Sequence, residues 1–112
     1  MKLKFYIAPL FIFLFCFFKT VNAQPNDGDY RSNFAVTGQW STAAGWERFD
    51  GTTMTWGVAA SAPTSTDGII TIRNGDSVRL NNAISIDQVV IENGGRLSIF
   101  STGGTVTVAN GA

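Results

Sequence analysis

The feature that most constrains this chain is a series of short apolar pairs between Gly68 and Val108. In each pair two aliphatic residues stand two positions apart, so both side chains lie on one face of an extended strand. The pairs are Ile70/Ile72, Val78/Leu80, Ile84/Ile86, Val89/Ile91, Leu97/Ile99 and Val106/Val108. Mostly polar residues separate them. The pattern predicts a ladder of short strands and an all-β fold.

The ladder has a regular spacing that favours stacked coils. Asn-Gly pairs begin at Asn74, Asn93 and Asn110, so successive pairs stand roughly 20 residues apart. A near-constant period of this size is typical of a right-handed parallel β-helix, in which each coil stacks on the previous one. Between Ile86 and Val89 the inward phase jumps by three residues instead of two, which a corner between two faces of a coil would explain.

A second arrangement fits the same residues. Asn-Gly between two alternating runs is the strongest short-range hairpin signal, so VVIENGGRLSIF would also form an antiparallel hairpin. The alternative fold is therefore a small antiparallel β-sandwich. Because a solenoid needs a cap at each end, the β-helix interpretation further predicts that coils 68–112 continue beyond Ala112 in a longer protein.

The N-terminal residues 1–23 have the organisation of a secretory signal peptide. Lys2 and Lys4 precede an apolar run over residues 5–18, and Ala23 ends a small-residue cleavage pattern. The run is shorter than the roughly 20 residues that are needed to cross a bilayer. The sequence therefore predicts a secreted protein, extracellular or at the cell surface, with no stable membrane insertion after signal cleavage.

Cleavage after Ala23 changes the charge and removes the thiol. All three lysines and the single cysteine leave, so five arginines face eight acidic residues and the net charge is −3. Scattered arginines in an acidic chain lack the clustered cations that nucleic-acid binding requires, which argues against a nucleic-acid partner. Without cysteine the mature chain forms no disulfide, so its stability must come from packing.

Two further segments precede the ladder. Residues 24–29 are polar and predict a flexible leader, and residues 30–67 form an aromatic-rich β cap and a connector. We expect two or three short strands in this cap. A turn or short helical turn is expected around residues 41–45, with Ser41 as the N-cap.

The three tryptophans of the cap, Trp40, Trp46 and Trp56, are candidate carbohydrate-binding residues because an indole ring can stack on a sugar ring. The competing interpretation is that they plug the end of the ladder, since aromatic side chains bury large areas in small cores. Either role remains open at this point.

The residue types exclude most catalytic and metal chemistry. The chain has no histidine, and the mature part has neither cysteine nor lysine, which removes Ser-His-Asp, Cys-His and Lys-base mechanisms and His/Cys zinc sites. The candidate catalytic carboxylates are Glu47, Asp50, Asp76, Asp87 and Glu92. The candidate calcium ligands are Asn26, Asp27 and Asp29. None stands in a motif that identifies a reaction or a metal, so we predict no enzyme, no metal and no cofactor.

Several of these residues together resemble a known family. The resemblance rests on Gly38-Gln39-Trp40-Ser41, Gly45-Trp46, Pro63, Asp67, the strand Ile69–Ile72 with Asn74-Gly75, and the run from Ile91 to Ile99. This pattern is similar to the eight-glycine extracellular module, which caps pectate-lyase-like right-handed β-helices in large secreted bacterial proteins. The resemblance implies a non-catalytic β cap that contacts carbohydrate or matrix. A longer insert, residues 47–62, replaces the compact link of that family.

The leading function hypothesis is a secreted structural and adhesive module whose partner is an extracellular glycan or a surface protein. The alternative is the N-terminal part of a β-helix polysaccharide lyase or hydrolase whose active site lies downstream.

Overall fold

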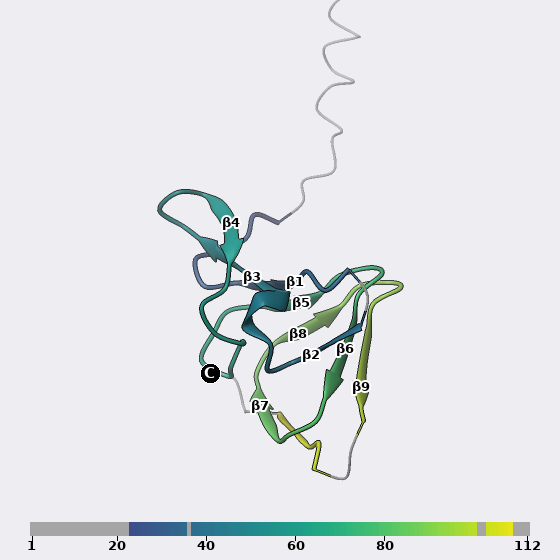
Figure 1. Ribbon diagram of the computed structural model, residues 1–112. Coiled ribbons are helices and arrows are strands. Elements are labelled where there is room, and N and C mark those ends of the chain that lie inside the picture. The colour runs from purple at the N-terminus through teal and green to yellow at the C-terminus, as the bar shows by residue number, and fades with distance from the viewer. Residues whose placement is uncertain (1–22, 36, 101–102, 109–112) are drawn as a thin grey trace, which may run out of the picture.

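The computed structural model describes residues 23–35, 37–100 and 103–108. These residues form an all-β structure, as predicted, with ten short strands and one turn of 3-10 helix (Figure 1). The elements are β1 (Tyr30–Ser32), β2 (Thr37–Gln39), η2 (Ala43–Gly45), β3 (Trp46–Asp50), β4 (Thr55–Val58), β5 (Ile70–Ile72), β6 (Ser77–Leu80), β7 (Ile84–Ile86), β8 (Val89–Ile91), β9 (Arg96–Ile99) and β10 (Val106–Val108). The signal-peptide prediction falls almost entirely on residues 1–22, outside the described part.

Strands β5 to β10 coincide with the six apolar pairs, so the predicted ladder is confirmed strand by strand. Glycine occupies the turns between β5 and β6 and between β8 and β9. Gly75 and Gly94, which follow Asn74 and Asn93, have φ angles of 89° and 88°. A side chain at either position would be strained, because L residues rarely adopt positive φ.

Strands β5, β6 and β7 pair in parallel with β8, β9 and β10, respectively. Ile70 of β5 faces Val89 of β8, and Val78 of β6 faces Leu97 of β9, which is the same offset along the sequence. Strands β7 and β10 pair at an offset that is longer by three residues. Strands β1 and β2 join the same sheets beside β5 and β6, also in parallel. The hairpin at Asn93, which the alternative arrangement predicts, does not form, because β8 and β9 lie in different sheets.

Antiparallel pairing occurs on one side of the cap. Strand β3 pairs antiparallel with β1 and with β4, so the five-stranded sheet has the order β4-β3-β1-β5-β8 and is mixed. The other two sheets have the orders β2-β6-β9 and β10-β7, and none of the three closes on itself. The cap thus contributes four strands, where two or three were expected.

The core lies between these sheets and is closed by the aromatic residues of the cap. Its buried members are Tyr30, Trp40, Trp46, Ala59, Ile70, Ile72, Val78, Leu80 and Ile86. The two tryptophan rings meet edge to face with centroids 4.9 Å apart. Trp46 Nε1 donates to the Trp40 carbonyl oxygen at 2.8 Å, and Trp40 Nε1 donates to the Pro63 carbonyl oxygen at 3.0 Å. Each indole N–H therefore has a partner inside the core, as a buried donor requires.

The opposite end of the core is open. Strands β8, β9 and β10 each form the edge of their sheet. Their inward side chains are exposed, Ile91 by 48%, Ile99 by 58% and Val108 by 72%. Their register partners in the neighbouring strands, Ile72, Leu80 and Ile86, are 0%, 0% and 6% exposed. Among the residues that the structure describes, one edge of each of β8, β9 and β10 therefore has no strand partner, and the aliphatic side chains beside these edges are exposed.

The short helical turn expected around residues 41–45 is present as η2, but its expected cap is not. The 3-10 helix η2 is preceded by Thr42, whose side chain makes no capping hydrogen bond, so the prediction of Ser41 as N-cap is wrong. The helix is a single turn that begins at Ala43, one residue later than a Ser41 cap would place it.

The C-terminal part of the leader is hydrogen-bonded to the five-stranded sheet and to the residue before β5. Gly28 N donates to the Phe49 carbonyl oxygen of β3 at 3.1 Å, and the buried Asp29 carboxylate accepts from the backbone N–H groups of Asn26 and Ile69 at 2.8 and 2.9 Å. Residues 26–29, expected to be flexible, thus bond to two strand regions. Within the described ranges, no helix has the length and apolar character to cross a membrane.

Candidate functional site

The candidate site lies on the outer face of the five-stranded sheet. Side chains alternate between the two faces of a strand, so Tyr30 and Ser32 point into the core while Arg31 points outward. The register places Arg31 opposite Glu47 on β3 and Thr71 on β5. Three polar side chains from three strands therefore form one row on the face that the core does not use.

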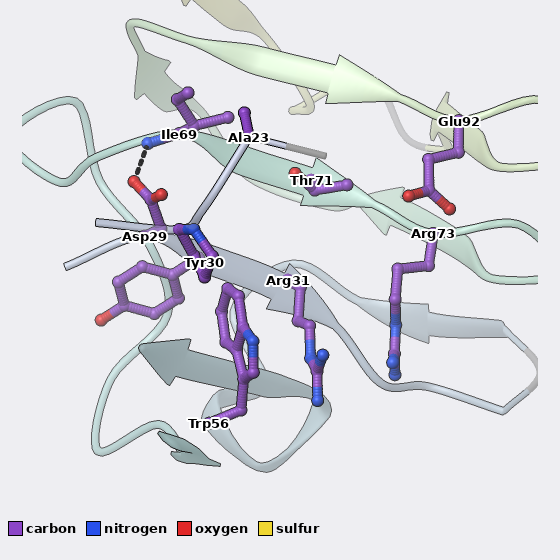
Figure 2. Close-up of a pocket in the computed structure, with 10 residues that line it drawn as sticks. Ala23, Asp29, Tyr30, Arg31, Trp56, Ile69, Thr71, Arg73 and Glu92 are labelled. Atoms are coloured by element: carbon purple, nitrogen blue, oxygen red, sulfur yellow. Dashed lines mark hydrogen bonds between the residues drawn. The ribbon is translucent and has the colours of Figure 1, made fainter. Parts of the chain in front are cut away.

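A cavity of about 320 Å³ opens on this face (Figure 2). Strands β1, β4 and β5 and the leader contribute most of its wall, and the β8–β9 turn contributes the rest. The lining residues are Ala23, Pro25, Asp29, Tyr30, Arg31, Trp56, Ile69, Thr71, Arg73 and Glu92. Its volume is at the lower end of the range of about 300–1,000 Å³ for small-molecule sites.

The structure separates the three candidate tryptophans. Trp40 and Trp46 are 2% and 0% exposed and belong to the core, so neither offers a ring face to a sugar in this structure. Trp56 is half-buried in edge strand β4 and lines the cavity. The expectation of a sugar-stacking surface therefore narrows from three residues to Trp56.

Neighbouring side chains hold the Trp56 ring in place. The Phe49 ring contacts it edge to face with centroids 5.2 Å apart, and the Arg31 guanidinium carbon lies 4.4 Å from the centroid of the indole. This arginine-on-indole contact is a cation–π interaction. Because the guanidinium covers one side of the indole, the cavity is a mixed aromatic and cationic surface instead of a bare tryptophan platform.

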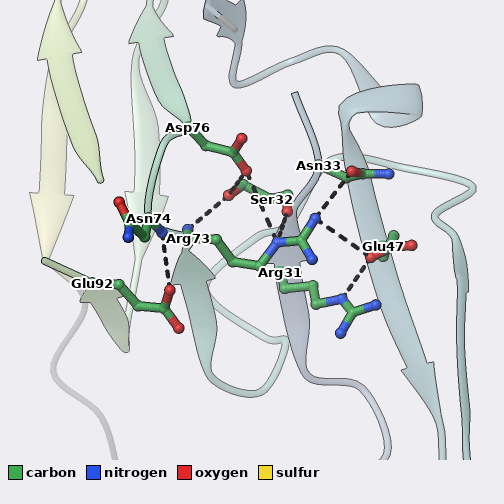
Figure 3. Close-up of polar contacts among 8 residues, drawn as sticks. All are labelled: Arg31, Ser32, Asn33, Glu47, Arg73, Asn74, Asp76 and Glu92. Atoms are coloured by element: carbon green, nitrogen blue, oxygen red, sulfur yellow. Dashed lines mark hydrogen bonds and ion pairs between the residues drawn. The ribbon is translucent and has the colours of Figure 1, made fainter. Parts of the chain in front are cut away.

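Arg31 and Arg73 are oriented by a polar network beside the cavity (Figure 3). Arg31 Nε donates to Glu47 Oε2 at 2.5 Å, and Arg73 Nη2 lies 3.9 Å from the same oxygen. Arg73 also donates through Nη2 to Asn33 Oδ1 at 3.0 Å. Glu47 therefore holds Arg31 by a charge-assisted hydrogen bond, which is stronger than a neutral one, and lies within ion-pair distance of Arg73.

Behind this network lies a buried serine and aspartate pair. Ser32 Oγ donates to Asp76 Oδ2 at 2.5 Å and accepts from the Arg73 backbone N–H at 2.9 Å. Ser32 is fully buried and Asp76 is nearly so. A hydroxyl with no access to solvent cannot reach a substrate, so the pair ties β1 to the β5–β6 turn and is not a nucleophile with its base.

The other carboxylates weighed from the sequence are placed outside the cavity or engaged by backbone. Asp50 accepts from the N–H groups of Thr52 and Thr53, and these hydrogen bonds hold the pKa of its carboxyl below the ordinary value of 3.8. Glu92 Oε2 accepts from Asn74 N at 2.9 Å, and Asp87 lies in the corner between β7 and β8.

The leader residues weighed for calcium are also bound to the chain itself. Asp27 Oδ1 accepts from Gly51 N at 3.0 Å, and both Asp29 oxygens accept from backbone, as described above. Over the residues that the structure describes, no group of three or more His, Cys, Asp or Glu side chains lies close enough to hold a metal ion.

The arginines and Thr71 of the cavity were not singled out from the sequence. Arg31 and Thr71 each stand between two inward residues, Tyr30/Ser32 and Ile70/Ile72, and this alternation marks them as outward. The residues around Arg31 and Thr71 in the sequence do not show that β1 and β5 are neighbours. Only the pairing of these two strands brings the two side chains together.

Comparison of the chain with protein-family models, with curated proteins and with solved structures finds no match. The resemblance to the eight-glycine extracellular module therefore stays a prediction.

Proposed function

We propose that this chain is a secreted, non-catalytic structural and adhesive module. In this proposal residues 30–67 cap a right-handed parallel β-helix, and residues 68–112 form its first coils. The outer face of the module contacts an extracellular glycan or a surface protein.

The register of the parallel strands carries the structural part of the proposal. Each strand from β5 to β7 pairs with the strand three positions later in the element order, and the offset is the same for the first two pairs. A chain that returns to the same three sheets in the same order describes successive coils around a shared core. Parallel connections of this kind are right-handed in about 98% of cases, which supports that hand.

The open end supports the same proposal. The apolar layer of Ile91, Ile99 and Val108 continues the buried layer below it at the same register. Unpaired strand edges beside exposed aliphatic side chains are a template for further strands. A following coil of parallel strands, with aliphatic residues at the same inward positions, has the complementary shape and hydrogen-bonding pattern.

A duplication of one coil tests the architecture. Residues 70–88 make up one round of the chain, because Ile70 pairs with Val89, and repeating them in place adds three strands in register with those before and after. Stacked coils gain stability with each added neighbour, so we expect a folded protein with a higher urea midpoint than the parent. The control carries an insertion of the same composition and length, in shuffled order, at the same point.

A sandwich and a coil stack respond differently to this change. An inserted coil lengthens a stack without altering existing pairs, whereas in a sandwich it separates strands that must pair. If the duplicated protein unfolds as readily as the shuffled control, the coil architecture is refuted. Circular dichroism and urea titration give the readout for both proteins.

A further inference from the structure

The cavity beside Trp56 has one apolar wall. The indole of Trp56, the side chain of Ile69 and the ring of Pro25 border it from a strand, a strand end and the leader. Figure 2 shows Ile69 and Trp56 at one side of the cavity, with Thr71, Arg73 and Glu92 extending toward the other. An apolar wall next to convergent polar groups is the usual composition of a small-molecule site.

The polar lining residues, of which Arg31 lies beside Trp56, keep hydrogen-bonding capacity. Arg31 uses Nε for Glu47, which leaves its two terminal nitrogens as further donors. Glu92 uses Oε2 for the Asn74 backbone and retains Oε1 as an acceptor. The Thr71 hydroxyl, between them on β5, can both donate and accept. These side chains therefore offer donors and acceptors within one cavity.

The charged groups in and beside the cavity have no excess of positive charge. Its four charged lining residues are Asp29, Arg31, Arg73 and Glu92, two acidic and two basic. Glu47, which pairs with Arg31, adds another negative charge beside them. A cavity of this balance gives an anionic ligand no net attraction, whereas hydroxyl groups can satisfy guanidinium donors and carboxylate acceptors together.

We infer that this cavity binds the terminal residues of a neutral oligosaccharide. A sugar ring has an apolar face of C–H groups and a rim of hydroxyls, which matches the indole wall and the polar wall. Hydroxyls of the ring bond Arg31, Thr71 and Glu92, and its C–H face lies against Trp56 and Ile69. This inference rests on the adhesive part of the proposed function and names its site and its ligand class.

Binding is measured by isothermal titration calorimetry on protein expressed from the complete 112-residue sequence and purified in its exported form. Intact mass establishes whether Ala23 has left the cavity. The probes are cellotetraose, mannotetraose and galactotetraose, with tetragalacturonate as the acidic counterpart. Concentrations up to about 10 mM cover dissociation constants in the millimolar range, where weak sugar contacts lie.

Three variants locate the site. Trp56→Ala removes the aromatic wall, and we expect an affinity loss of about tenfold or more for the neutral probe that binds. Thr71→Val keeps the shape of the side chain and removes its hydroxyl, with an expected loss of about three- to tenfold. Val58→Ala is the matched control, because Val58 is exposed on the same strand as Trp56 but does not line the cavity.

The outcomes separate the site from the scaffold. Binding of a neutral probe that both cavity variants weaken and Val58→Ala does not is the expected result. Binding of tetragalacturonate alone overturns the ligand class, and absence of binding by every probe overturns the site. In either case the coil duplication still decides the architecture independently, because it does not involve the ligand.

Discussion

Two isoleucines at equivalent positions of neighbouring strands differ in how much of each side chain is exposed. Ile72 of β5 and Ile91 of β8 are register partners, and the first is fully buried while the second is 48% exposed. Truncating a buried isoleucine to alanine removes its apolar contacts and leaves a cavity, at a cost of about 2–5 kcal/mol. About half of the Ile91 side chain is already in water, so Ile91→Ala is expected to cost about 1–2 kcal/mol.

The comparison is made by urea titration at low protein concentration, where self-association is least. Emission from the buried Trp40 and Trp46 reports unfolding of the core directly. We expect Ile72→Ala to lower the free energy of unfolding by about 1–3 kcal/mol more than Ile91→Ala does. If the two losses agree within about 0.5 kcal/mol, the inward face of β8 is covered in solution and the open end does not exist in the isolated protein.

Two further predictions concern single carboxylates. Asp76→Ala leaves the buried Ser32 hydroxyl without its acceptor and is expected to lower the free energy of unfolding by about 2–3 kcal/mol in the same urea titration. Asp76→Asn keeps an acceptor oxygen and is expected to lower it less. Equal losses of stability in the two variants would contradict this role of Asp76. The folded-state pKa of Asp50 is depressed, so the stability it contributes is present above pH 3.8 and is lost as the pH falls through the lower folded value. An NMR titration of its carboxyl carbon is expected to have its midpoint below 3.8, with the Thr52 and Thr53 amide shifts following it, and a midpoint at or above 3.8 refutes the assignment.

The strands were predictable because their signal is local. A pair such as Val78/Leu80 needs only an extended backbone to place both side chains on one face, and β6 forms there. The period also carried information, since the spacing between Asn74 and Asn93 equals the offset at which β5 pairs with β8. Local alternation could not decide between a hairpin and a parallel pair at Asn93, because both use the same turn residues.

The exposure of the three tryptophans could not be predicted because it depends on distant partners. Trp46 begins β3 and is covered by Phe34 and Trp40, which contact it edge to face. Trp56 also has Thr and Gly near it in the sequence, but it lies on the edge strand β4. Its ring contacts Phe49 and Arg31 beside the cavity. Which ring becomes core and which borders a cavity follows from strand order, which composition does not contain.

The unequal offsets of the parallel pairs arise in the connections between strands. The corner between β6 and β7 spans residues 81–83, whereas the corresponding corner between β9 and β10 spans residues 100–105. The three extra residues account for the longer offset between β7 and β10 than between the pairs in the other two sheets. At Gly104, in this longer corner, a Cβ atom would lie 2.7 Å from the Leu80 carbonyl oxygen, so only glycine lets the chain pass so close to β6. The inward pairs keep their register across all three sheets because the corners, and not the strands, absorb the difference in length.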